Sequence, residues 1–172
     1  MAVLPIVRVP EAVLRQKTKK VKKIDGAIQK LIDDMIETMH DAPGVGLAAN
    51  QVGIGLRICV MQVPGEEVIT LINPEIVRRS GAREVEEGCL SLPGYKGTLQ
   101  RSEKVVVKGL NRDGRPVRYH AEDLLAEIIE HEVDHLNGLL YFDYIDSIEK
   151  LTPVGAGADE DDAEEEGAAK GP

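Results

Sequence analysis

The sequence predicts an α+β domain, because one amphipathic helix precedes a run of strands, a second helix follows them, and helices do not alternate with the strands. The first helix is expected over Asp25–Asp41, where apolar residues recur every three or four positions before Pro43 and Gly44 end the pattern. β-branched stretches bounded by Gly, Pro or Asn predict strands over Leu56–Val63, Val68–Ile72, Ile76–Arg79 and Lys104–Leu110.

A hairpin and a helix are expected to complete the domain. The pair Asp113-Gly114 predicts a tight turn that leads into a further strand over Val117–His120. The second helix is expected over Glu122–Asn137, where the apolar residues again follow helical spacing and Gly138 gives the stop signal.

Length and charge predict one domain followed by a tail. The chain has 172 residues, 42% of them hydrophobic, which suits a single domain over residues 1–150. Residues 151–172 hold seven acids and one base of a chain whose net charge is −9, and they are expected to be a disordered acidic tail, with an acidic docking tail as the alternative. The nearly neutral body and the acidic tail argue against nucleic acid as a partner.

The predicted cellular compartment depends on two features that the sequence lacks. It shows neither an apolar run long enough for a membrane span nor the order of a signal peptide. Its two cysteines, Cys59 and Cys89, are therefore expected to remain thiols in a reducing cytoplasm. No membrane partner is expected.

The motif HEVDH carries the most specific chemistry. His131 and His135 lie four residues apart in the second predicted helix, so both imidazoles can reach one metal ion. Glu132 lies about 100° round the helix from His131, where a carboxylate can stand beside a metal-bound water without ligating the ion. The pattern is typical of a metal-activated hydrolase.

A catalytic site of this kind usually has a third protein ligand. Downstream of His135 the candidates are acidic, namely Asp143, Asp146 and Glu149. Upstream, Cys89 lies in EGCLSLPG next to Gly88, whose lack of a side chain lets backbone approach closely, and its thiolate is a good ligand for a first-row metal. From the residues alone both sources stay open, whereas Cys59 is expected to be a small buried hydrophobe.

The segment GVGLAANQVG, residues 44–53, is rich in small residues. Its first six residues match the dinucleotide pattern G-x-G-x-x-A, but it follows a helix and Pro43 instead of a strand, which argues against that function. The small residues allow the backbone of a ligand to approach, and Gln51 offers an amide donor. Close packing of a helix on a sheet is the structural alternative.

In this order, GVGLAANQ, EGCLS and HEVDH resemble the three signature motifs of the peptide deformylase family, and the resemblance extends over about Val3–Asp146. It implies antiparallel or mixed sheets packed around a central helix that carries H-E-x-x-H, with an amphipathic helix nearer the N-terminus. It also implies hydrolysis of the formyl group from N-terminal formyl-methionine of nascent chains, which releases formate. The expected partners are these nascent peptides. The protein is expected to be a monomer and to come transiently close to the ribosome.

The resemblance also implies a role for each matched residue. The metal ligands are Cys89, His131 and His135, with water as the fourth, and the native ion is expected to be Fe²⁺, replaceable by Zn²⁺, Ni²⁺ or Co²⁺. Glu132 is the general base and acid, and the Gln51 amide and the Leu90 backbone N–H stabilise the oxyanion. Gly46 pairs with the extended peptide backbone beside Gly88, and the methionine pocket is lined by Val45, Leu124 and Ile128.

Three positions depart from the family pattern. Glu130 stands where Gln is frequent, Asp123 replaces a common Gly, and Glu127 occupies a position that is often apolar or small near the pocket. A zincin-type metallopeptidase with a His or Glu third ligand is the alternative enzyme. A structural metal-binding module and an inactive relative that only binds are the alternatives that are not enzymes.

Overall fold

The computed structural model describes residues 1–154. It contains two α-helices, α1 (Gly26–Asp41) and α2 (Asp123–Leu136), and two antiparallel sheets. The larger sheet has the strand order β1-β2-β3-β6-β7, and the smaller has the order β4-β5-β8. The predicted α+β class is therefore confirmed. The bounds of the strands are β1 (Gly46–Ala48), β2 (Ile58–Met61), β3 (Ile69–Ser80), β4 (Arg83–Cys89), β5 (Leu92–Arg101), β6 (Lys104–Leu110), β7 (Pro116–Glu122) and β8 (Thr152–Pro153).

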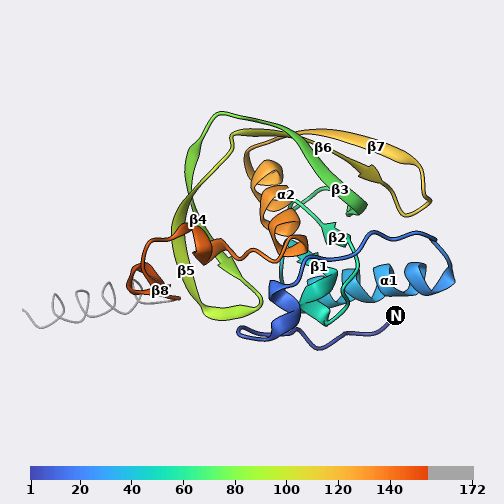
Figure 1. The fold of residues 1–172 in the computed structure, drawn as a ribbon, viewed down its shortest axis with the longest axis horizontal. Coiled ribbons are helices and arrows are strands. Elements are labelled where there is room, and N and C mark those ends of the chain that lie inside the picture. Colours follow the sequence, from blue (N-terminus) through green and yellow to red (C-terminus); the bar gives the residue numbers. More distant parts are fainter. Residues whose placement is uncertain (155–172) are drawn as a thin grey trace, which may run out of the picture.

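Helix α2 lies in the middle of the molecule, between the β4–β5 hairpin and the larger sheet (Figure 1). Its apolar residues Ala126, Ile129, Val133 and Leu136 join a core cluster with residues of the larger sheet, such as Met61 and Val107. Helix α2 contacts every strand of the larger sheet, namely β1, β2, β3, β6 and β7.

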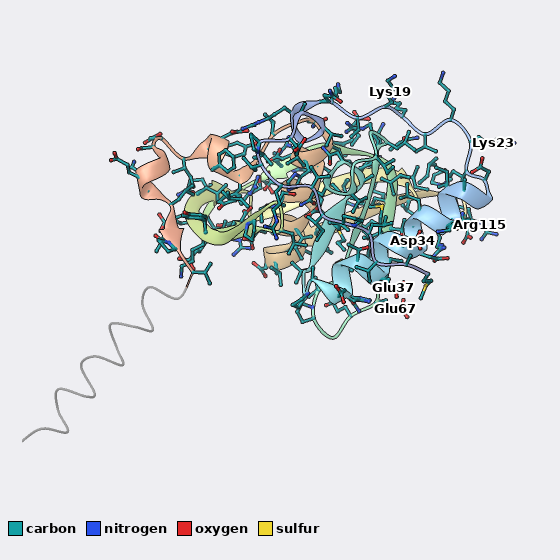
Figure 2. All side chains as sticks on the ribbon, turned by 90° about the horizontal axis from the view of Figure 1, so that it is seen from below. Lys19, Lys23, Asp34, Glu37, Glu67 and Arg115 are labelled. Atoms are coloured by element: carbon teal, nitrogen blue, oxygen red, sulfur yellow. The ribbon has the colours of Figure 1, made fainter. Side chains whose placement is uncertain are left out.

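Helix α1 packs through a second core cluster that includes Ile32, Met35 and Met39 together with Ile58 and Val60 of β2. Asp25 caps its N-terminus, because its carboxylate accepts the backbone N–H of Ile28 at 3.1 Å. The N-terminal segment runs along this helix, where Asp34, labelled in Figure 2, accepts the backbone N–H of Ala2 at 2.8 Å.

Two strand predictions need correction. Val68–Ile72 and Ile76–Arg79 are parts of one strand, β3, which continues through a bulge at Asn73 and Pro74. Asn73 adopts φ 53°, and its side-chain amide makes hydrogen bonds of 2.8 and 3.0 Å with both backbone groups of Val21, which tie the bulge to the segment before α1. The expected hairpin at Asp113-Gly114 is confirmed, because β6 and β7 pair antiparallel around it.

The end of the described chain pairs with the smaller sheet. Thr152 and Pro153 form β8 against Lys96 and Tyr95 of β5, so regular pairing extends past residue 150. The rest of the predicted acidic tail, residues 155–172, lies outside the described residues. Among residues 1–154, no helix is long and apolar enough to cross a membrane.

Candidate active site

Three potential metal ligands from two elements converge beside the smaller sheet. In α2 the Nε2 atoms of His131 and His135 lie 3.1 Å apart, and Sγ of Cys89 at the end of β4 lies 3.2 Å from Nε2 of His135. One ligand atom from each of these residues lies within 4.8 Å of the others. Both histidines come from one helix face because residues four apart overlie each other.

The sulfur is held by the turn that joins β4 to β5. The β4–β5 register shifts between Glu87 and Cys89, and a Cβ on the intervening Gly88 would lie 3.2 Å from the carbonyl oxygen of Tyr95. Sγ of Cys89 receives the backbone N–H of Ser91 at 3.4 Å and the side-chain amide of Gln51 at 3.6 Å. These contacts fix the position of the sulfur beside the two histidines.

This donor set fits a divalent first-row metal. A thiolate and two imidazoles suit Fe²⁺, Zn²⁺, Ni²⁺ or Co²⁺. Nδ1 of His131 lies 2.6 Å from Oε1 of Glu87. Hydrogen bonds from Arg101 and His131 outweigh the effect of burial and lower the pKa of Glu87 to about 2, so Glu87 only accepts and Nδ1 of His131 carries the proton. A neutral His131 with its proton on Nδ1 would present the lone pair of Nε2 to a bound metal ion.

The downstream acids do not join the cluster. Asp143 is paired with Arg15 at 2.6 Å, Asp146 with Lys150 at 3.1 Å, and Glu149 is exposed. Within residues 1–154, the convergent group of potential ligands is the one that contains Cys89.

Glu132 lies beside the cluster and is nearly inaccessible to solvent, with 3% of its surface exposed. Its Oε1 is 4.0 Å from Nε2 of His131, and its Oε2 is buried without a hydrogen-bond partner among the described residues. Burial disfavours the carboxylate and, against the opposing effect of His131, raises its pKa to about 7. A group with this pKa can take up and release a proton near neutral pH.

Backbone and amide groups complete the surroundings. The side chain of Gln51 is oriented by the backbone N–H of Ala48, which donates to its Oε1 at 3.0 Å, so its amide N–H groups point toward Cys89 and Ser91. Gly46 belongs to β1, which is at the edge of the larger sheet. A Cβ at Gly46 would come within 2.7 Å of Oε1 of Glu132, so the backbone passes directly over this carboxylate.

These groups open into a cavity of about 690 Å³. His135 is buried and does not line it. All of the other proposed site residues do: Val45, Gly46, Gln51, Gly88, Cys89, Leu90, Leu124, Ile128, His131 and Glu132. Val45 and Leu124 are 40% and 39% exposed, respectively, and so present apolar surface to this cavity. A second hollow, of about 380 Å³, lies near Asn73 and Lys108 and contains none of these residues.

Two important residues were not predicted from the sequence. Glu87 receives Nδ1 of His131, and Arg101 of β5 holds Glu87 through two N–H groups at 2.7 and 2.9 Å. Arg101 also donates to Asp134 of α2 at 2.7 Å. Glu87 is the first residue of the EGCLS motif, so the signal for it was an acid that alternation places on the inner face of β4.

The three residues that depart from the family pattern lie in different surroundings. Glu130 faces away from the cavity and accepts the backbone N–H of Ser102 at 2.6 Å. Glu127 lines the cavity 3.5 Å from Arg83, and burial raises its pKa. Asp123 adopts φ 52°, which explains why glycine suits the start of this helix.

Together, the fold and the donor set define an α+β protein with a candidate metal centre beside a buried carboxylate. Residues 3–151 match the model of the polypeptide deformylase family. The chain is 53% identical over 156 residues to a peptide deformylase of Dehalococcoides mccartyi, which covers 90% of this chain and 93% of the relative. The chain belongs to the polypeptide deformylase family.

Solved structures support the same assignment. A crystal structure of a peptide deformylase from Legionella pneumophila superposes with a TM-score of 0.84 and 42% identity, covering 99% of this chain and 100% of that one. A peptide deformylase from Ehrlichia chaffeensis in complex with actinonin also gives a TM-score of 0.84 and 42% identity, covering 87% of this chain and 92% of that one.

Proposed function

We propose that this protein hydrolyses the formyl group from the N-terminal formyl-methionine of newly made polypeptides and releases formate. The observation that carries the proposal is the convergence of Cys89, His131 and His135 beside the buried Glu132, at the wall of a cavity, in a chain of this family. A site built for binding alone would not require an unpaired carboxylate at that position.

Cys89, His131 and His135 would hold the metal ion. When bound, a divalent cation supplies a Lewis acid that polarises the formyl carbonyl and lowers the pKa of a nearby water molecule. We propose Fe²⁺ as the native ion, with Zn²⁺, Ni²⁺ or Co²⁺ as replacements.

Glu132 would act as the base and then the acid. It accepts a proton from the attacking water, whose oxygen bonds to the formyl carbon, and it later donates a proton to the amine as the carbon–nitrogen bond breaks. Its buried, unpaired Oε2 and its pKa of about 7 support both steps.

Gln51 and Leu90 would stabilise the negative charge that develops on the formyl oxygen. The amide N–H groups of Gln51 point toward the cluster because Ala48 fixes the other end of that amide. The backbone N–H of Leu90 would be the second donor. Removing one such donor from other hydrolases costs about 2.7–4 kcal/mol of transition-state stabilisation.

The peptide would bind as an additional strand. Gly46 lies in the edge strand β1, whose backbone can pair with an extended chain. The methionine side chain would then contact Val45, Leu124 and Ile128, and Gly88, which lines the same cavity, would contact the peptide. Because a peptide deformylase structure in complex with actinonin resembles this chain, we also propose that actinonin binds in this cavity.

We further propose that the protein is a monomer that meets nascent chains in the cytoplasm, without direct contact with nucleic acid. Gel filtration would test the first point, because a dimer would elute at twice the 18.7 kDa of one chain.

The decisive experiment is formate release from formyl-Met-Ala by protein purified without oxygen, compared with a Glu132→Gln variant. Loss of the base is expected to lower kcat by about 10²- to 10⁴-fold while the metal content stays the same. Equal activity of the two proteins would contradict the role of Glu132, and an inactive, metal-loaded parent would contradict the proposed function.

A further inference from the structure

Tyr144 connects the segment after α2 to a buried group on that helix. It ends a 3₁₀ turn, Tyr141–Tyr144, and remains 49% exposed, but its hydroxyl donates to Oδ2 of Asp134 at 2.9 Å. Its ring also faces the guanidinium of Arg101, whose carbon lies 5.2 Å from the ring centroid. Burial and the nearby Asp134 raise the pKa of Tyr144 to about 12, so the hydroxyl remains a donor.

The same oxygen of Asp134 accepts Nη1 of Arg101 at 2.7 Å, so one carboxylate oxygen joins the tyrosine to the arginine. The other two donors of Arg101 hold both oxygens of Glu87, and Oε1 of Glu87 receives Nδ1 of His131. An unbroken series of hydrogen bonds therefore runs from Tyr144 to the imidazole of His131.

Water cannot readily replace the middle of this series. Asp134, Arg101 and Glu87 are only 7%, 5% and 7% exposed, respectively. In such surroundings, hydrogen bonds to charged groups are strong, and a change in one alters the geometry of the next. Two carboxylates and one guanidinium leave one net negative charge next to the metal site, which favours a cation there.

We propose that Tyr144 is a positioning residue for the metal site, acting through Asp134, Arg101 and Glu87 on the orientation of His131. This inference rests on the metal site proposed above. Without the hydroxyl, Asp134 loses one of the two donors to Oδ2 and can rotate about its side chain. Arg101 then follows Asp134, and the carboxylate of Glu87 turns relative to the His131 ring.

The test compares a Tyr144→Phe variant with the parent and with a Tyr119→Phe control. Tyr119 lies on β7 and packs against the core, outside the hydrogen-bond series from Tyr144 to His131. The Tyr119→Phe substitution therefore removes a tyrosine hydroxyl without changing that series. The Tyr144 variant is expected to release Co²⁺ to a chelator about 3- to 10-fold faster, less than the roughly 10- to 100-fold effect on metal affinity expected for a group that contacts a ligand directly. The visible absorption of the Co²⁺ form should change, and in the Zn²⁺ form the proton resonance of His131 Nδ1–H should shift.

A double variant tests the route. If Tyr144 acts through Glu87, its replacement should have no further effect on Co²⁺ release in a Glu87→Gln background. Additive effects would overturn the proposed route. A purely structural role predicts a lower melting temperature of the metal-free protein with unchanged spectra and Co²⁺ release, and that result would overturn the proposal.

The outcomes separate this inference from the proposed function. A parent that binds Co²⁺ but releases no formate contradicts only the function. A parent that binds no Co²⁺ contradicts both the function and the inference.

Discussion

Gly46 provides the sharpest test of the site's geometry. A Cβ added there would lie 2.7 Å from Oε1 of Glu132 and 3.0 Å from its Cγ and Cδ, whereas ordinary contacts begin at 3.4 Å. The carboxylate of a Gly46→Ala variant would therefore have to retreat by about 0.7 Å, in an interior packed too densely to absorb the change without cost. Displacement of a catalytic group by about 1 Å can lower the rate about 100-fold.

We therefore expect kcat for formyl-Met-Ala to fall about 10- to 100-fold in Gly46→Ala, which is about 1.4–2.7 kcal/mol of transition-state stabilisation. KM should change little because alanine keeps the backbone N–H and C=O, and the metal content should stay the same because Glu132 is not a proposed ligand. Gly55→Ala is the matched control, since its Cβ would meet nothing within 4 Å. A Gly46→Ala enzyme with the parent's kcat would refute the placement of the base beneath β1.

Four further changes test other parts of the molecule. Cys89→Ser should leave the protein folded but largely free of metal after dialysis, as elemental analysis would show; full occupancy would contradict the thiolate as a ligand. Glu87→Gln should weaken Zn²⁺ binding about 10- to 100-fold in a chelator competition, and unchanged affinity would separate Glu87 from the metal site. At Asp123, whose φ is 52°, valine should lower the free energy of unfolding by about 1–2 kcal/mol while glycine should not, as urea titration would show; equal effects would contradict the backbone explanation. Arg15 lowers the pKa of Asp143 despite burial, so the pair stabilises the fold above the unfolded pKa of the carboxyl and loses that effect as pH falls through the lower folded pKa. Asp143→Asn should therefore cost about 0.2–1 kcal/mol at pH 7 and nothing at acidic pH, in melting curves recorded across that range.

The elements that the sequence predicts best are those whose buried positions are apolar. Helix α1 begins one residue after the predicted start and ends at the predicted Asp41, and β6 has both predicted bounds. In these segments the burial pattern and the hydropathy pattern coincide, so periodicity identifies both the element and its inner face.

The strands β4 and β5 were missed because their inner faces are partly charged. Along β4 the buried positions are Val85 and Glu87, which alternate with the exposed Glu84 and Glu86, so the inner face is half acidic. On β5 the buried Arg101 carries the opposite charge and donates a hydrogen bond to Glu87. Each charge is tolerated inside only because the other is there, and such a pair cannot be recognised from either strand alone.

The residues of the site also divide into those that the sequence predicts and those that it does not. His131 and His135 were predicted as ligands from residue type and spacing and Cys89 from the family resemblance, and the structure brings these three residues together. Glu87 and Arg101 depend on contacts between segments far apart in the chain, such as His131 with Glu87 across 44 positions, and nothing in local spacing encodes these contacts.

The motif HEVDH also explains why the ligands, the base and the supporting contacts are not independent. Successive residues on a helix point about 100° apart, so neighbouring residues of the motif meet different surroundings, whereas His131 and His135 share one face. The five residues of the motif contact, in order, Glu87 of β4, Gly46 of β1, the core of the larger sheet, Arg101 with Tyr144, and Cys89. A shift of α2 would move all of these contacts together, so a substitution that displaces the whole helix should be detectable in metal binding as well as in turnover.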